Sequence, residues 1–198
     1  MLQYCSAAVL QLAAEPQNSR TAVQKSFNGS TAGRQYIMPL LNIRTQIKTI
    51  LESVTGIGVV HDYERWTNDW KKTLEFFKPE NQDNFNGWMV TRTATEERAK
   101  VFGKNIASHN FLIRGIYTLD DAAASEKIFQ DLIEGIRTAF RTNFTLNGTC
   151  ITTYVDIDSM NGGGKLGIQV KTVEVRTFAS ALCHYCELQL GAQEYESR

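Results

Sequence analysis

The sequence lacks several features that define large classes of protein. It has three prolines among 198 residues, which excludes a long proline-rich linker. No apolar run approaches the length needed to span a bilayer, so no membrane segment or membrane partner is expected. The apolar start, Met1 to Leu10, has no preceding Lys or Arg, and a signal peptide needs such a basic segment. We therefore expect a chain that is not exported.

An excess of charge of either sign is also missing. Lys plus Arg and Asp plus Glu each total 21, which gives a formal net charge of zero. Nucleic-acid binders usually carry a basic excess that neutralises phosphate, so specific nucleic-acid binding is not expected. Little net charge also means little repulsion between copies, which favours a chain that works in an assembly. The 42% of hydrophobic residues suffice for one domain with a core.

Cysteine is sparse as well, with four residues at positions 5, 150, 183 and 186. Without an export signal, reduced thiols are expected. Cys183-His184-Tyr185-Cys186 resembles a metal or redox motif, but it lies in a strand-like run, where residues three apart point to opposite faces. No second such motif completes a ligand set. We therefore expect neither a metal nor a cofactor.

Two other motifs have structural explanations. The glycine run before Lys165 is followed by Leu166 and a strand, whereas a phosphate-binding loop needs Ser or Thr and then a helix. Asp156 and Asp158 alternate near a turn, where solvated aspartates are common. No catalytic residues are assigned, and the chain is predicted not to be an enzyme. A small enzyme with a pocket built from scattered residues such as His61, Asp156 and Cys183 is the alternative.

Domain organisation follows from a change in composition near residue 38. Residues 1–37 are rich in Ala, Gln, Ser, Thr and Asn and have one acid, Glu15, so they predict an arm or a start-site extension. Met38-Pro39 is a possible alternative start. Residues 38–198 are predicted to form a single α+β domain. In it a mainly antiparallel sheet carries two amphipathic helices on one face and ends in a long C-terminal β-hairpin.

Both helices show a single apolar stripe. The first is expected over 43–54, with Asn42 as N-cap and Gly56 as the left-handed residue after its end. The second is expected over 122–142. Its stripe comprises Ile128, Phe129, Leu132, Ile133, Ile136 and Phe140. A short third helix, capped by 67–69, is expected to reach Phe77.

Strands are indicated by β-branched and aromatic residues. They are expected over 57–66, 88–95, 111–119 and 150–157. Residues 96–105 between the middle two are expected to be a hairpin tip or a mobile loop. The turn Asn161-Gly162-Gly163-Gly164 then precedes an extended stretch from 167 to 190. That stretch is too long for an ordinary strand, so it must bend, bulge or project.

Two surface groups are candidates for a subunit contact. The first is the turn of Asn161, Gly162, Gly163, Gly164 and Lys165, at the tip of a hairpin over 150–190. The second is an aromatic tract that begins with Trp66 and Trp70, because aromatic residues are enriched at interfaces. Acids interrupt the bases in this tract, which argues against a site for single-stranded nucleic acid. Deleting 161–165 is predicted to break the assembly without unfolding the subunit.

Taken together, residues 40–190 resemble the tail terminator, or tail completion (minor tail), proteins of long-tailed bacteriophages. The element order carries the resemblance. The helix that opens Asn42-Ile43-Arg44-Thr45-Gln46-Ile47 is followed by a strand at 59–63, paired strands around 88–90 and 111–117, the long helix and the closing hairpin.

The resemblance implies a homo-oligomeric ring, typically a hexamer, that caps the tail tube and joins it to the head connector. The implied partners are other copies of the chain, the tail-tube protein and the head connector or neck proteins. The implied location is the virion tail or neck, and the host cytoplasm during assembly. A head–tail adaptor or neck protein of the same particle is the nearest alternative. A small enzyme and a nucleic-acid-binding module are more distant ones.

Overall fold

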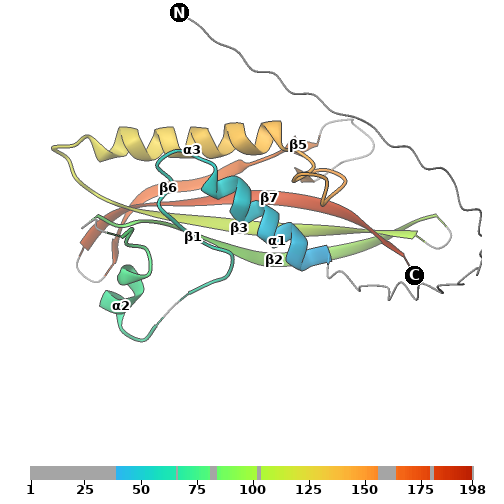
Figure 1. Ribbon diagram of the computed structural model, residues 1–198, viewed down its shortest axis with the longest axis horizontal. Helices are drawn as coiled ribbons and strands as arrows, with labels where there is room; N and C mark the ends of the chain where they lie inside the picture. The colour runs from blue at the N-terminus through green and yellow to red at the C-terminus, as the bar shows by residue number, and fades with distance from the viewer. Residues whose placement is uncertain are drawn as a thin grey trace, which may run out of the picture. The chain divides into compact units, whose positions relative to one another are not determined.

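The computed structural model of the chain describes residues 39–65, 67–80, 84–101, 104–155, 164–178 and 181–197. The predicted arm, 1–37, lies outside these residues, so its two interpretations remain predictions. The main feature is a five-stranded mixed sheet (Figure 1). In spatial order its strands are β1 (Val59–His61), β2 (Asn86–Val101), β3 (Lys104–Thr118), β7 (Ala181–Ser197) and β6 (Gln169–Phe178). Three pairings are antiparallel, and β1 joins β2 in parallel, which confirms the predicted α+β class.

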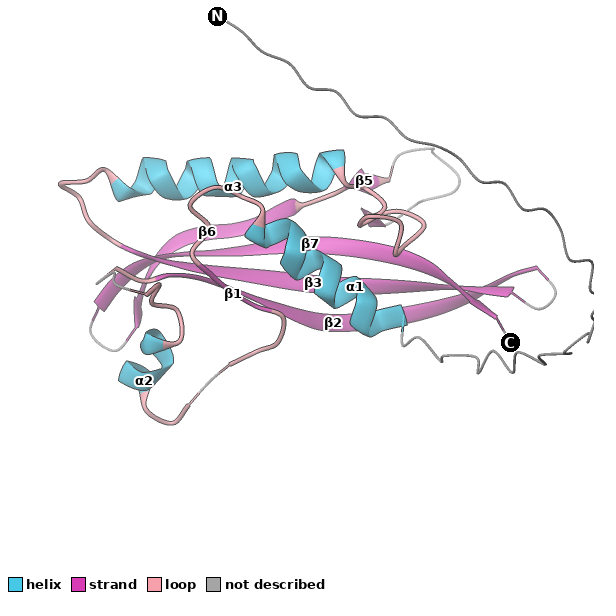
Figure 2. Cartoon of the chain, viewed as in Figure 1, coloured by secondary structure: helices cyan, strands magenta, loops and turns pink. Residues whose placement is uncertain are grey.

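The β2–β3 hairpin is longer than the sequence predicted. Its register runs from Asn86 opposite Tyr117 to Val101 opposite Lys104, so the segment expected to be a loop continues both strands. The register shifts between Arg92 and Ala94 and again between Ala99 and Val101. Figure 2 shows both strands crossing the whole sheet, and β7 pairs with β3 along its full length. Long antiparallel pairing of this kind satisfies the backbone groups of residues whose side chains are exposed.

The C-terminal half corrects two predictions. The extended stretch from 167 to 190 is not one strand but two, because β6 ends at Phe178 and β7 starts at Ala181 to pair back against it. The hairpin expected over 150–190 is therefore absent as such. A separate two-stranded sheet of β4 (Tyr154–Val155) and β5 (Lys165–Leu166) occupies the earlier part, and the long C-terminal hairpin is β6–β7. The turn 161–163 lies outside the described residues.

Helix α1 (Pro39–Glu52) starts earlier than expected. Asn42 is inside the helix rather than its N-cap, because Pro39, which suits the first helical position, begins it. Gly56 does adopt a left-handed conformation, with φ of 78°, but it lies four residues beyond the last helical residue. Strand β1 is much shorter than the predicted 57–66. Residues 150–157 likewise contribute only the two residues of β4 among those described.

Helix α3 (Ser125–Thr142) confirms most of its predicted stripe. Phe129, Leu132, Ile133, Ile136 and Phe140 are buried. Ile128 is the exception, since 41% of it is exposed. The short helix α2 (Trp70–Glu75) begins where predicted, and the Asp69 carboxylate accepts a hydrogen bond from the Lys71 backbone N–H at 3.0 Å.

Two hydrophobic clusters account for the core. The larger one combines α1 and α3 with alternate residues of three strands, namely Trp88, Val90, Phe111, Ile113, Cys186, Leu188, Leu190 and Ala192. The smaller one contains Phe77, Met89, Ile116, Cys183 and Tyr185. Because successive strand residues point to opposite faces, the two clusters lie on opposite sides of the sheet.

The close approach of Trp88 to β3 depends on a glycine. Gly115 is directly opposite Trp88, and a Cβ atom on Gly115 would lie 2.5 Å from the indole Cζ3 atom. Trp88 is fully buried and stacks on Phe129 of α3 with ring centroids 5.9 Å apart. The missing side chain at 115 thus makes room for the largest residue in the core.

Candidate functional site

The residues predicted to contact a partner are only partly within the described chain. Four lie outside it, namely Trp66, Asn161, Gly162 and Gly163. Gly164 directly precedes β5, where Lys165 is exposed, and Trp70 is the first residue of α2. The contact role of these residues remains a prediction.

The C-x-x-C motif does not bring its two thiols together. Cys183 belongs to the smaller core cluster and Cys186 to the larger one, so they lie on opposite faces of β7, as predicted. Burial raises the pKa of Cys183 to about 11 and that of Cys186 to about 12. Both are therefore neutral thiols near pH 7, and the thiol is much less reactive than the thiolate. Within the described residues, no three His, Cys, Asp or Glu side chains group as a metal site would require.

The His61 side chain is held by a hydrogen bond to the backbone of Phe76. Its Nε2 atom lies 2.8 Å from the Phe76 carbonyl oxygen, and its ring meets Phe77 edge-on at 5.5 Å. Phe77 shares the smaller core cluster with Cys183. Two of the residues considered for an enzyme pocket thus border the same cluster, while Asp156 lies outside the described chain. The raised pKa of the Cys183 thiol makes it a weak nucleophile there.

A polar chain crosses three neighbouring strands at the other end of the sheet. His109 Nδ1 lies 2.8 Å from the Thr95 hydroxyl, and His109 Nε2 lies 2.8 Å from the Glu194 carboxylate. His109 is 3% exposed and Glu194 is 5% exposed. A hydroxyl, an imidazole and a carboxylate in this order also occur in hydrolase triads. Here, however, all three side chains belong to paired strands, whose backbone N–H groups serve the ladder rather than an oxyanion. We interpret the hydrogen-bonded side chains of Thr95, His109 and Glu194 as a structural link between β2, β3 and β7.

The third histidine fixes the start of α3. His184 Nε2 lies 2.9 Å from the Ser125 hydroxyl, which also accepts a hydrogen bond from the Asp120 backbone N–H at 2.8 Å. The His184 ring stacks on Phe129 with centroids 5.7 Å apart. The sequence did not predict either histidine contact, because the partners are 59 and 85 residues apart.

One edge of the main sheet carries exposed aliphatic side chains. Strand β6 pairs with β7 on one side, and no described strand pairs with its other side. Val170, Val173 and Val175 are 42%, 38% and 51% exposed. Their partners in the register are Leu188, Cys186 and His184, so all three valines are on the face of the larger core cluster. The register shift between Val170 and Thr172 is what keeps Val170 and Val173 on one face although they are three residues apart.

The opposite edge differs in character. Strand β1 covers only Gly87 to Met89 of β2, which leaves the rest of that strand without a second described neighbour. Its exposed residues include Glu96, Glu97 and Arg98, and an ion pair of 3.5 Å joins Arg98 to Glu96. Charged side chains on an edge discourage random pairing between sheets. Among the described residues, the sheet therefore has one open edge that exposes valines and another whose exposed side chains include Glu96, Glu97 and Arg98.

Comparison with known proteins does not assign the chain to a family. Neither a protein-family model nor a curated protein matches the chain. Within the described residues, no helix is long and apolar enough to cross a membrane.

Proposed function

We propose that the protein is a structural subunit that assembles into a homo-oligomeric ring by joining sheet edges. The observation that supports this most directly is strand β6, which exposes three valines and a backbone edge that no described strand pairs with. An exposed apolar edge strand is a template for pairing with another chain, and natural proteins usually cover it. The zero net charge favours the same conclusion, because copies of the chain repel one another little.

The two edges suggest how a ring would close. We infer that β6 of one copy adds to the open part of β2 in the next, beyond Met89. This contact joins two different surfaces, and such head-to-tail contacts generate rings where the rotation between copies closes, whereas a contact between two identical β6 edges would give only dimers. Both edges carry mixed charges, with Lys171, Glu174 and Arg176 on β6 facing Glu96 and Arg98 on β2. Main-chain hydrogen bonds would supply affinity, and these charges would fix the register.

The helices leave the edges available for this contact. We infer that α1 and α3 cover one face of the sheet, because both contribute to the larger core cluster together with alternate residues of β2, β3 and β7. Helices that cover a face bury its apolar side chains but leave the edge strands unpaired.

The particle in which such a ring would serve is proposed from a resemblance in the sequence. We propose a bacteriophage tail terminator, a ring that caps the tail tube and meets the head connector. The resemblance in element order over residues 40–190 supports this role, and the turn 161–165 is the proposed contact with a neighbour. The virion tail is the proposed location.

Assembly is tested with substitutions on β6. Light scattering and native mass spectrometry over a concentration series should give a closed oligomer for the unaltered chain. Replacing both valines, Val173→Lys and Val175→Lys, should give monomers with an unchanged circular dichroism spectrum. The control is Leu41→Lys, which adds one lysine, half the charge of the double variant, at an aliphatic residue 55% exposed on α1 and should still assemble. A strictly monomeric native chain, or a doubly substituted chain that assembles normally, would contradict the proposal.

An experiment in which native and doubly substituted chains are mixed distinguishes a head-to-tail ring from a symmetric dimer. The doubly substituted subunit keeps its β2 edge, so it should add to a native chain and stop further growth there. Native mass spectrometry of the mixture should then detect short assemblies that each end in one substituted subunit. If β6 pairs only with β6, the substituted subunit stays out of every complex. Addition of tail-tube protein to the native ring tests the tail role, and a ring that never joins tubes would refute it.

A further inference from the structure

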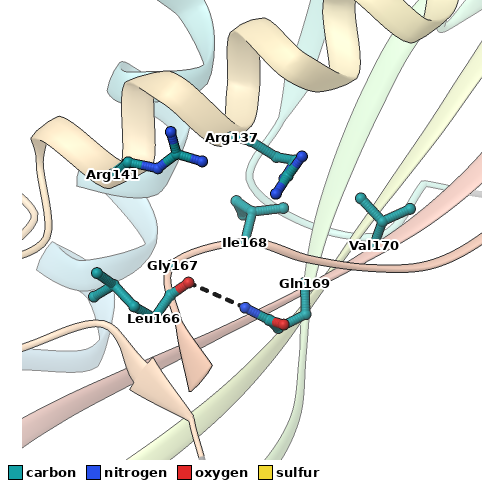
Figure 3. A pocket seen from close by; sticks show the side chains of 7 residues that line it. All are labelled: Arg137, Arg141, Leu166, Gly167, Ile168, Gln169 and Val170. Atoms are coloured by element: carbon teal, nitrogen blue, oxygen red, sulfur yellow. Dashed lines mark hydrogen bonds between the residues drawn. The ribbon is translucent and has the colours of Figure 1, made fainter. Parts of the chain in front are cut away.

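A pocket of about 350 Å³ lies between the last turns of α3 and the segment that connects β5 to β6 (Figure 3). Arg137 and Arg141, one helical turn apart, line it from the helix. Leu166, Ile168 and Val170 line it from the connecting segment. Figure 3 shows both arginines on the side of the helix that faces the connecting segment, with Ile168 below them in this view. The pocket thus combines two cationic groups with an apolar wall.

The two arginines are not fully neutralised by their surroundings. Arg137 donates hydrogen bonds from Nη1 to both carboxylate oxygens of Glu134, at 2.6 and 2.8 Å, and no described residue takes a hydrogen bond from its Nε or Nη2 groups. For Arg141, the described part of the chain provides no hydrogen-bond or ion-pair partner. Counting only described residues, one carboxylate against two guanidinium groups leaves one positive charge in excess at the pocket.

The end of the helix does not cancel this charge. Helix C-termini carry a partial negative charge on carbonyl oxygens that lack partners. In α3 that charge is about half a unit, less than the guanidinium excess, and the Ala139 oxygen is occupied by hydrogen bonds from the Thr142 hydroxyl and from the Asn143 backbone and side chain. The Thr138 oxygen also accepts a bond from Thr142. The pocket therefore remains an attractive position for an anion.

The connecting segment is held in a fixed conformation. The Gln169 side-chain amide donates a hydrogen bond to the Leu166 carbonyl at 3.0 Å, and the Gly167 N–H donates to Thr153 at 3.3 Å. Gly167 has a left-handed φ of 64°, and a Cβ atom there would meet no other atom within 4 Å. Ile168 is buried, while Leu166 and Val170 are about two-fifths exposed, at 40% and 42%. The pocket wall is therefore preformed, and a ligand that binds there would bury the exposed apolar surface of Leu166 and Val170.

We propose that this pocket binds an oxyanion, a carboxylate or a phosphate, carried on a short apolar body. Guanidinium groups bind both oxyanions through paired N–H donors, and Leu166 and Val170 would cover the apolar part. The volume limits the body to a small one, since it is near the lower end of the range for ligand pockets. All lining residues belong to one copy, so the pocket forms without the assembly proposed above, although Val170 is shared with the β6 edge of that assembly.

The test uses the full chain with labelled isoleucine and valine methyl groups, which remain observable by NMR in a large assembly. The probes are hexanoate, hexyl phosphate and hexanol at millimolar concentrations. Hexanoate or hexyl phosphate should shift the Ile168 and Val170 methyl signals in a saturable way, and Ile47, fully buried on α1, should stay unchanged. A response to one of the two anions alone identifies the oxyanion. Hexanol, which has a similar alkyl group but no charge, should bind much more weakly.

Substitution of the arginines makes the test specific. Arg141→Gln should weaken anion binding roughly ten- to one-hundred-fold, as expected for the loss of a hydrogen bond between charged groups. Arg98→Gln, which removes the same charge on β2, should leave the affinity unchanged. An unaltered Ile47 signal confirms that each variant is folded. The proposal is overturned if no anion shifts the two methyl signals, if hexanol shifts them equally, or if Arg141→Gln binds as tightly as the unaltered chain.

Discussion

The pairing of Gly115 with Trp88 allows a quantitative prediction about the core. A Cβ atom at 115 would lie 2.5, 2.7 and 2.8 Å from three atoms of the indole six-membered ring. Because carbon atoms pack best at about 3.5–4.0 Å, the ring or the strand must move by roughly 1 Å. Overpacking of this kind costs about 1–3 kcal/mol. Replacing glycine with alanine returns about 0.4–1 kcal/mol by restricting the unfolded chain, so we expect Gly115→Ala to destabilise the fold by about 1–2 kcal/mol.

A double-mutant cycle tests the cause. Trp88→Leu removes the ring atoms that the new methyl group would meet, so in that background Gly115→Ala should be neutral or slightly stabilising. The coupling energy between the two sites should therefore be about 1–3 kcal/mol. Equilibrium unfolding in urea, followed by far-UV circular dichroism at one protein concentration, measures all four variants.

Gly87→Ala is the matched control for the cycle. A Cβ atom there would lie 2.4 Å from Phe77 on the opposite face of the sheet, so its cost should not depend on Trp88. If Gly115→Ala costs the same with and without the tryptophan, the steric explanation is refuted.

Two further predictions concern buried polar groups. Glu194→Ala leaves the imidazole of His109, which is 3% exposed, without its hydrogen-bond partner and should destabilise the fold by about 1–3 kcal/mol in the same urea assay. A loss below about 1 kcal/mol would show that the pair contributes little. The second prediction concerns Cys183 and Cys186, whose thiols have pKa values raised from 9.0 to about 11 and about 12 by burial. A raised folded-state pKa means that stability is full below pH 9 and falls as the pH rises from 9 towards 11–12, so the melting temperature should drop over that window. Iodoacetamide should modify both thiols at least about 100-fold more slowly in the folded chain than in urea at pH 8, which mass spectrometry measures; equal rates would contradict the burial of both.

Local periodicity accounts for what the sequence predicted well. The apolar stripe of α3 and the positions of β2 and β3 repeat with the period of a helix or a strand, so they can be recognised without knowledge of the partner. The prediction that Cys183 and Cys186 point apart rests on the same rule. Ile128 fits the helical stripe but lies at its margin, where 41% exposure shows that no neighbouring element covers it.

Errors occurred where two local patterns were equally consistent with the sequence. The run from 167 to 190 is extended throughout, and nothing in its alternation marks the reversal between Phe178 and Ala181. The segment 96–105 is polar enough for a loop, but its backbone pairs in a hairpin whose side chains face solvent. Asn42 is a good N-cap residue and predicts a helix start at Ile43, although Pro39, where α1 begins, is also suited to a helix start.

The sequence by itself determined the α+β class, two amphipathic helices and a chain with no excess of charge. Tertiary structure alone decided the strand order β1-β2-β3-β7-β6, and with it which edges stay open and which histidines meet their partners. The difference is physical, because helix and strand periods depend on neighbours a few residues away. Strand order and the contact between His109 and Glu194, by contrast, join residues as many as 85 positions apart. The free edge at β6 and the arginine pocket beside it exist only once that order is fixed.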